Sequence, residues 1–498
     1  MRKEKTHYTK KAVRSSAIIF IMSMLAAFLA YLLRLLLARN LTPAEYGLFY
    51  SIFSLFGFMA IFRDFGLGSA LVKHIAEFNV KKKYQQIKSS IVFVMGFQLV
   101  CSFIISSILF LLSDYLAINF FKEPSASLFI RIFALMFFIM PLERVLIYSL
   151  QGFQKMVYLS LDEFLRMLLI ISATYVLFIY DKTAASPSIA YLFSQAILFV
   201  IYIPLFLKAW PLFLKTKTRI TFDLSKKLLH FGLSFTVGLF GLYILSYTDT
   251  LVLTYFRPLE EVGWYNVAIP TSKLLLYFTN SLAIVLLPLS SELWAKRRID
   301  KLKIGITLLH KYSFVMIMPL AMVMISFPKL IIKFFFGQAY VNGSIALQIL
   351  SIGMVLYNVG FINNNILSGI GKPRESTKII IVASLVNLVL NILFIPKFGI
   401  IAAASTTLFS YLIILIWSSA KIRHFIDVKI PYWAWAKSFI AGMSFIAAVW
   451  VIKRNLSYSD MAEFFICSIA AGIFYIITVL LFRIVDIKEI KDLIKSSL

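Results

Sequence analysis

The chain has 498 residues, of which 60% are hydrophobic and only 15% are charged. A mean hydropathy of +0.87 excludes an ordinary soluble domain, because a soluble fold cannot hide so much apolar surface. The net charge of +27 would suit a nucleic-acid partner, but the cations gather between long apolar runs. This pattern favours membrane topology and anionic headgroups, so no nucleic-acid partner is expected.

Uncharged runs of membrane-spanning length recur along the chain, for example at residues 91–112, 188–207, 401–420 and 464–482. A helix of about 20 residues crosses the roughly 30 Å of hydrocarbon, and a continuous run favours a helix over a barrel strand. We therefore predict about 14 transmembrane helices, at residues 14–38, 46–70, 89–112, 126–147, 157–179, 188–207, 228–255, 263–290, 304–327, 344–370, 376–395, 399–420, 432–452 and 461–482.

Lysine and arginine are concentrated in alternate connections between these helices. Because cytoplasmic loops carry the excess of positive charge, this bias places both termini in the cytoplasm. We expect a multi-pass protein of the plasma membrane, with a charged amphipathic tail at residues 486–495. Cys101 and Cys467 lie in apolar runs, so neither a disulfide framework nor a metal site is expected.

The first half of the sequence is repeated in the second at a nearly constant offset. The stretch TPAEYGLF, with Gly47, matches RPLEEVGWY, with Gly263, at an offset of 215 or 216 residues. The stretch LQGFQK, with Gly152, matches LSGIGK, with Gly369, at an offset of 217. Two separated landmarks with one period indicate a duplicated bundle, and duplicated membrane bundles are most often transporters.

The repeat period contains six predicted helices, so both copies enter the membrane in the same orientation. This predicts an all-α integral membrane protein with two pseudo-symmetric six-helix lobes about an axis along the membrane normal. We assign residues 1–215 to an N-lobe with helices 1–6 and residues 216–425 to a C-lobe with helices 7–12. Residues 426–498 carry helices 13 and 14 and the cytoplasmic tail. A central cavity is expected where the lobes meet.

Three stretches resemble the polysaccharide-transporter flippases of the multidrug/oligosaccharidyl-lipid/polysaccharide exporter superfamily. LLLARNLTPAEYGLFYSIFSL with FRDFGLGSALVKHIAE is similar to the opening two helices of that family. YTDTLVLTYFRPLEEVGWYNVAIPTSKLL resembles its seventh and eighth helices. LSGIGKPRESTKIIIVASLVNLVLNILFIPKFGIIAAASTTLFSYLI resembles its tenth to twelfth. The resemblance implies a fold like that of the multidrug exporters (MATE) of the same superfamily.

The resemblance also implies a flippase that moves a polyprenyl-(pyro)phosphate-linked sugar or oligosaccharide to the outer leaflet by alternating access. Such a protein serves cell-surface polysaccharide or glycoconjugate assembly. Its partners are the lipid-linked saccharide and the bilayer, with glycan-assembly proteins and a proton or sodium coupling ion compatible with the same role. No cofactor and no enzymatic activity is expected.

Charged side chains inside the membrane are the candidate site residues, because each costs about 2.5–3.5 kcal/mol or more at mid-depth unless it has a partner or a wet cavity. We predict that Arg63, Arg131 and Lys273 form a cationic cavity for the substrate phosphate, since arginine binds phosphate oxygens in bidentate fashion. Arg34 and Arg166 are further candidates. Snorkelling explains Arg34 at least as well, and local ion pairs with Asp162 and Glu163 on the same helix explain Arg166.

Two carboxylates are candidates for binding a coupling ion or balancing the cations: Asp249, which could also pair with Lys273, and Asp64. Asn363 and Asn364 lie near the middle of a predicted helix, where buried amides need partners. They either contact sugar hydroxyls or join helices. No catalytic residue and no metal ligand is predicted.

Two other classes of protein remain as alternatives. A membrane polysaccharide polymerase or ligase handles the same lipid carriers, but it needs a sizeable outer loop, and every outer connection here is short. A multidrug or cation antiporter of the same superfamily would favour an acidic cavity, which the number of membrane-embedded cations argues against.

Overall fold

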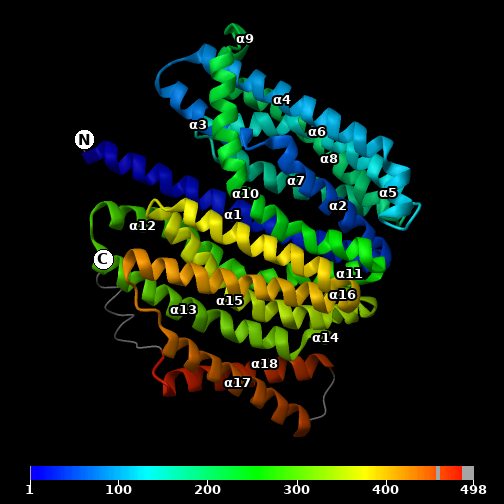
Figure 1. Cartoon of the computed structure of the whole chain (residues 1–498), viewed down its shortest axis with the longest axis vertical. Coiled ribbons are helices and arrows are strands. Elements are labelled where there is room, and N and C mark those ends of the chain that lie inside the picture. Colours follow the sequence, from blue (N-terminus) through cyan, green and yellow to red (C-terminus); the bar gives the residue numbers. More distant parts are fainter. Residues whose placement is uncertain (1, 456–459, 485–498) are drawn as a thin grey trace. The chain divides into compact units, whose positions relative to one another are not determined.

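The computed structural model describes residues 2–455 and 460–484, and these residues form helices and short connections without a β-strand. Figure 1 shows them as long coiled ribbons. Among the described residues, eleven helices are long and apolar enough to cross a membrane. The prediction of an all-α integral membrane protein is therefore confirmed. The predicted tail at residues 486–495 lies outside the described residues.

The chain divides into two compact units, Met1–Gly263 and Trp264–Leu498, and it passes from one to the other within helix α11 (Leu259–Lys273). The helix expected to open the C-lobe therefore belongs to the first unit. The lobe boundaries predicted at residues 215 and 425 refer to the sequence repeats and not to these compact units, and they stay a prediction.

The helices of the first unit pack around an apolar core contributed mainly by α3, α4, α6, α8 and the start of α10. Leu71, Ile91, Ile147 and Leu198 represent these helices in that core and are almost fully buried. The helices of this unit before α11 are α1 (Arg2–Asn40), α2 (Pro43–Asp64), α3 (Leu67–Val80), α4 (Tyr84–Leu111), α5 (Ser113–Asn119), α6 (Ala126–Gly152), α7 (Val157–Tyr180), α8 (Ala185–Ala209), α9 (Leu212–Lys215) and α10 (Phe222–Phe256).

In the second unit α15 is the central helix, with α12, α13 and α16 packed around it, and α17 and α18 lie beside each other next to α13 (Figure 1). After α11, its elements are η1 (Leu274–Leu276), α12 (Tyr277–Ala295), α13 (Ile299–Ser326), α14 (Pro328–Phe336), η2 (Gln338–Gly343), α15 (Ser344–Gly369), α16 (Pro373–Ile426), α17 (Tyr432–Asn455) and α18 (Asp460–Leu481).

The predicted helix at 46–70 is broken in the structure. Phe65 and Gly66 both adopt the left-handed backbone conformation, with φ of 45° and 67°, which ends α2 and starts α3. A Cβ on Gly66 would lie 2.2 Å from the carbonyl oxygen of Gly232 on α10. Glycine is therefore required here for its backbone conformation and for the close approach of α10.

One further predicted boundary differs from the structure, because the predicted helix at 263–290 is interrupted by the 3-10 turn η1, directly after Lys273. The predicted helices at 376–395 and 399–420 are the two arms of α16, separated by a kink at Gly399, whose φ and ψ are 55° and −133°. The short helices α3, α5 and α14 lie partly or wholly in segments that hydropathy assigned to connections.

The landmarks of the sequence repeat occupy matching positions. Gly152 is the last residue of α6 and Gly369 the last residue of α15. A Cβ on Gly152 would lie 2.7 Å from the Cβ of Ile75, and one on Gly369 would lie 2.0 Å from Ser290 Oγ. In each half, the glycine thus lets a helix end approach a neighbouring helix closely.

Candidate functional site

Arg63 is a buried cation that forms no ion pair with a carboxylate among the described residues. It lies in the last turn of α2, and only 7% of its surface is exposed. Its Nη1 donates to Met140 Sδ at 2.7 Å, and its guanidinium lies 4.8 Å from the ring centroid of Phe137. Its Nε is buried without a hydrogen-bond partner in the described part of the chain, where Arg63 also makes no ion pair. Five guanidinium donors in such a place retain unused capacity for an anion.

Asp64, the neighbour of Arg63, is held by local hydrogen bonds. Its Oδ1 accepts from the backbone amide of Gly68 at 3.1 Å and from Gln98 Nε2 at 2.6 Å. Gly68 lies in the first turn of α3, where backbone amides lack helical partners. Asp64 therefore links the junction of α2 and α3 to α4. Its role in ion coupling stays a prediction.

Arg166 is part of a buried network of α6, α7 and α8. Its Nη2 lies 2.9 Å from Asp162 Oδ2 and 3.0 Å from Glu143 Oε2, and its Nη1 donates to Gln195 Oε1 at 2.7 Å. Gln195 Nε2 in turn donates to Glu143 Oε2 at 3.1 Å. Both carboxylates are fully buried. The local pair of Arg166 with Asp162 on α7 is confirmed.

Arg144 completes this network, with Nη1 3.6 Å from Asp162 Oδ2 and Nε 3.7 Å from Glu143 Oε2. Two arginines thus balance two carboxylates. These four side chains can be buried because their charges cancel. Removing one member of a buried ion pair leaves an uncompensated charge that costs about 3–5 kcal/mol. The sequence pattern revealed the i, i+4 pair on α7 but not the contribution of Gln195, a neutral residue on another helix.

Arg131 lies apart from this cluster. Its Nη2 contacts Asp114 Oδ2 at 2.8 Å, its Nε donates to Ser113 Oγ at 2.9 Å, and 42% of its side chain is exposed. Six residues separate it from Phe137, about 9 Å along α6 at the helical rise. The structure therefore does not place Arg131 in contact with Arg63.

Arg34 on α1 lies on an aromatic surface, its guanidinium 4.4 Å from the ring centroid of Tyr50. Tyr46 and Tyr191 also interact with it electrostatically. Arginine over tyrosine faces is a cation–π arrangement. The tyrosines offer a partly buried cation a favourable setting without a carboxylate.

Asp249 and Lys273 differ in environment. Asp249 is 4% exposed on α10, between the buried Thr248 and Thr250. Lys273 is exposed and is the last residue of α11, directly before the 3-10 turn η1. The two residues belong to different units, and their pairing stays a prediction.

The candidate amides on α15 join helices. Asn363 is fully buried, with Oδ1 2.7 Å from His310 Nε2 on α13, and its Nδ2 donates to Ser418 Oγ at 3.0 Å and Ser419 Oγ at 3.1 Å on α16. Asn364 is 9% exposed, and its Oδ1 is buried without a hydrogen-bond partner in the described residues.

The side chain of Asn363 therefore links α15 to α13 and α16, whereas Asn364 Oδ1 accepts no hydrogen bond from the described residues. Sequence reasoning missed His310, because a single histidine in an apolar helix gives no periodic signal. It also missed Asn358, whose Nδ2 donates to Ser313 Oγ at 3.2 Å and whose Oδ1 accepts from Thr279.

Two family models match the chain. The model described as polysaccharide biosynthesis protein matches residues 12–294, and the MatE model matches residues 235–393. Together they cover most of both repeats.

Two relatives match nearly the whole chain. An uncharacterized membrane protein of Methanocaldococcus jannaschii, MJ1068, is 33% identical, over 98% of this chain and 99% of the relative. The probable low-salt glycan biosynthesis flippase Agl15 of Haloferax volcanii is 22% identical, over 97% of this chain and 98% of the relative.

Solved structures show the same fold at low sequence identity. The lipid II flippase MurJ in an inward closed conformation gives a TM-score of 0.77 at 18% identity, covering 97% of this chain and 100% of that one. An inward-facing multidrug resistance MATE transporter gives 0.66 at 16% identity, covering 82% and 98%. The predicted MATE-like fold is thereby confirmed.

Proposed function

We propose that this protein flips a lipid-linked saccharide across the membrane. The chain belongs to the polysaccharide biosynthesis protein family of the multidrug/oligosaccharidyl-lipid/polysaccharide exporter superfamily. The substrate is a polyprenyl-(pyro)phosphate-linked sugar or oligosaccharide, moved from the cytoplasmic to the outer leaflet by alternating access. The full-length match to a probable glycan biosynthesis flippase supports this proposal.

Arg63 is the observation in this chain that carries the proposal furthest. A buried guanidinium without an ion pair in the described residues is costly unless an anion neutralises it during function. A phosphate or pyrophosphate group has the charge and the oxygens to do so. Arg34 is the second candidate, whereas Arg166 and Arg131 already contact carboxylates and contribute mainly to structure. Lys273 stays a candidate for binding the phosphate, because it is exposed and lies directly before the 3-10 turn η1.

The cellular setting follows from the same proposal. The protein resides in the plasma membrane with both termini in the cytoplasm, as the distribution of lysine and arginine favours. Asp249 is the stronger candidate for coupling to a proton or sodium ion, because Asp64 serves the junction of α2 and α3. Asn364, with its vacant acceptor, is a candidate for contact with the saccharide.

The proposal is tested by transport of a fluorescent polyprenyl-pyrophosphate-linked disaccharide in vesicles that contain the full chain. We expect Arg63→Gln to lower the initial rate at least 10-fold, because a charge-assisted phosphate contact contributes about 1.5–3 kcal/mol. Arg374→Gln is the matched control, since Arg374 is exposed at the start of α16, and we expect an unchanged rate. Wild-type transport by Arg63→Gln would reject the role of Arg63, and no transport by the wild-type chain would reject the function.

A multidrug or cation antiporter is the second candidate, favoured by the match of the MatE model to residues 235–393. The same vesicles decide between the two functions. Uptake of an organic cation against its gradient, together with no movement of the lipid-linked saccharide, would favour the antiporter.

A further inference from the structure

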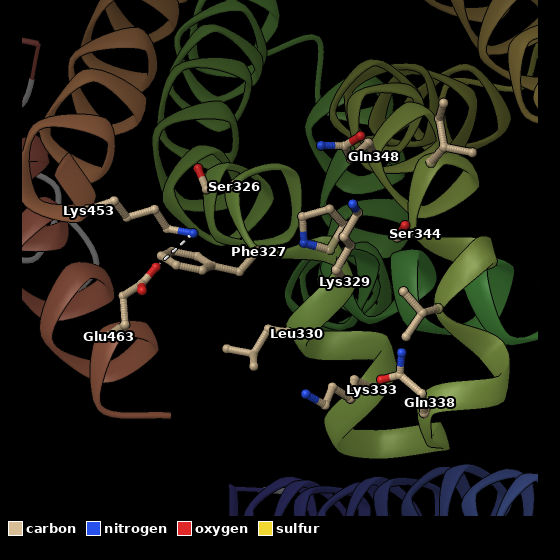
Figure 2. A pocket seen from close by; sticks show the side chains of 13 residues that line it. Ser326, Phe327, Lys329, Leu330, Lys333, Gln338, Ser344, Gln348, Lys453 and Glu463 are labelled. Carbon is tan, nitrogen blue, oxygen red and sulfur yellow. Dashed lines mark ion pairs between the residues drawn. The ribbon is translucent and has the colours of Figure 1, made fainter. Parts of the chain in front are cut away.

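A cavity of about 580 Å³ lies within the second unit, where α13 ends and α14, α15, α17 and α18 meet. Figure 2 shows Lys453 and Glu463 on one side of it and Lys329 and Lys333 on a facing ribbon. The topology from the sequence places this end of the helices at the outer membrane surface. None of the residues assigned to the proposed transport site lines this cavity.

The lining is cationic. Lys329, Lys333 and Lys453 contribute three positive charges, and Glu463 is the single carboxylate among the lining residues. Lys453 Nζ lies 2.9 Å from Glu463 Oε1 and 4.4 Å from the ring centroid of Phe327, so its position is fixed. Lys329 is exposed and makes no hydrogen bond or ion pair within the described ranges. The formal charges of the lining residues therefore sum to +2.

Neutral hydrogen-bonding groups accompany the lysines. Ser326 Oγ is buried and has no hydrogen-bond partner in the described part of the chain, and Ser344 and Gln338 also line the cavity. Hydroxyl and amide groups can donate to the oxygens of an anion. The unsatisfied hydroxyl of Ser326 is the kind of buried polar group that a bound ligand would satisfy.

Apart from Gln348, whose Nε2 donates to the carbonyl oxygen of Ile325 at 2.8 Å, the rest of the lining is apolar, contributed by Phe327, Pro328, Leu330, Val341 and Ile345. A free inorganic anion has no apolar surface to bury against this lining, whereas the first carbons of a lipid tail do. Lysines at the ends of membrane helices also lie at headgroup level, where they attract anionic lipid.

We propose that this cavity binds the phosphate ester headgroup of a lipid, with Lys329, Lys333 and Lys453 around the phosphate and the apolar lining against the start of the tail. The ligand is either an anionic membrane phospholipid or a polyprenyl phosphate, which share this chemistry. Glu463 restrains Lys453 and weakens binding by its negative charge. The site is separate from Arg63 and does not depend on the proposed transport function.

Binding is measured on the purified full chain in detergent with three probes: dioctanoyl phosphatidylglycerol, a short polyprenyl phosphate and inorganic phosphate. Dioctanoyl phosphatidylcholine serves as the zwitterionic comparison. For at least one of the two anionic lipids, we expect binding that the triple variant Lys329→Gln, Lys333→Gln, Lys453→Gln weakens at least ~10-fold. We expect Glu463→Gln to tighten it ~3-fold or more, because the net charge of the lining rises. Lys397→Gln, a change at an exposed lysine in α16, is the matched control and should leave binding unchanged.

Several outcomes would overturn the proposal: equal lipid binding by the triple variant, weaker or unchanged binding by Glu463→Gln, or inorganic phosphate binding as tightly as the lipids. A preference for phosphatidylglycerol or for polyprenyl phosphate identifies the source of the headgroup. Lys329→Gln alone, a change at an exposed position, tests the same site if the triple variant does not fold. Arg63→Gln should bind the lipid probes as the wild type does, which separates this site from the proposed transport site.

Discussion

At the scale of single residues, charge in this protein is of two kinds. Glu143, Asp162 and Arg166 satisfy one another in a buried network, whereas the guanidinium of Arg63 contacts Met140 Sδ and the Phe137 ring and makes no ion pair in the described part of the chain. A hydropathy profile does not distinguish these four residues, because each is an ionisable side chain in an apolar stretch. Their partners, several of which lie on other helices, decide which charge is already compensated within the fold.

Asp64 allows a test of structural against coupling roles. We expect Asp64→Ala to lower the free energy of unfolding by about 1–3 kcal/mol, because the Gly68 amide and the buried Gln98 lose their acceptor. Asp64→Asn keeps an oxygen acceptor and should cost less than about 1 kcal/mol. Unfolding in a denaturing detergent series measures both values. A stable Asp64→Asn variant without transport would instead assign Asp64 to ion coupling.

Glu77 on α3 should make stability sensitive to acid. Hydrogen bonds from Lys81 and Lys227 hold the pKa of Glu77 at about 2, below its ordinary value. A carboxyl with a lowered pKa stabilises the fold above its ordinary pKa near 4.5, and the stabilisation is lost as the pH falls toward 2. Burial lowers the pKa of His74, so its protonation below about pH 6.5 also disfavours the folded state.

The measurement is the unfolding temperature of the full chain between pH 7.5 and pH 3. We expect Glu77→Gln to flatten the part of the curve below pH 4.5 and to lower stability at pH 7 by less than about 1 kcal/mol, because this cluster is partly exposed. Glu260→Gln, a change at an exposed glutamate, should leave the curve unchanged. A Glu77→Gln curve identical to that of the wild type would contradict this account.

At the scale of helices, the repeated motif forms a close crossing between the starts of α2 and α11. A Cβ on Gly47 would lie 2.0 Å from the carbonyl oxygen of Leu259, and one on Gly263 would lie 2.1 Å from that of Pro43. The two glycines that correspond in the sequence repeat therefore each face the backbone of the other copy of the motif. The repeat predicted their equivalence, but nothing in their spacing predicted that they meet.

We expect Gly47→Ala and Gly263→Ala each to lower the free energy of unfolding by about 1–3 kcal/mol or more, because a backbone oxygen cannot move away as a side chain can. Gly96→Ala in α4 is the control, since its Cβ would meet no atom within 4 Å. This change should be neutral or stabilising by up to about 1 kcal/mol, because alanine favours the helix. Thermal unfolding of the purified variants compares them, and equal behaviour of Gly47→Ala and Gly96→Ala would exclude the crossing.

At the scale of the whole molecule, orientation in the membrane is the open prediction. In a chain with Cys101→Ser and Cys467→Ser, we expect Lys397→Cys to react with a membrane-impermeant maleimide on intact cells, because Lys397 is exposed at the kink of α16. Arg374→Cys, at the start of α16, should react only after the membrane is permeabilised. The reverse pattern would place the termini outside.

The sequence by itself determined the fold class, most of the spanning segments and the presence of a repeated motif in the two halves. Hydropathy and repeat spacing are local or periodic properties, and the membrane requires each span to satisfy its own backbone. Tertiary structure alone decided the break at Phe65 and Gly66, the helix α14 beside the cationic cavity, and the partners of Arg166 and Asn363. These features depend on residues far apart in the chain, whose approach is set by helix packing and leaves no periodic signal in the sequence.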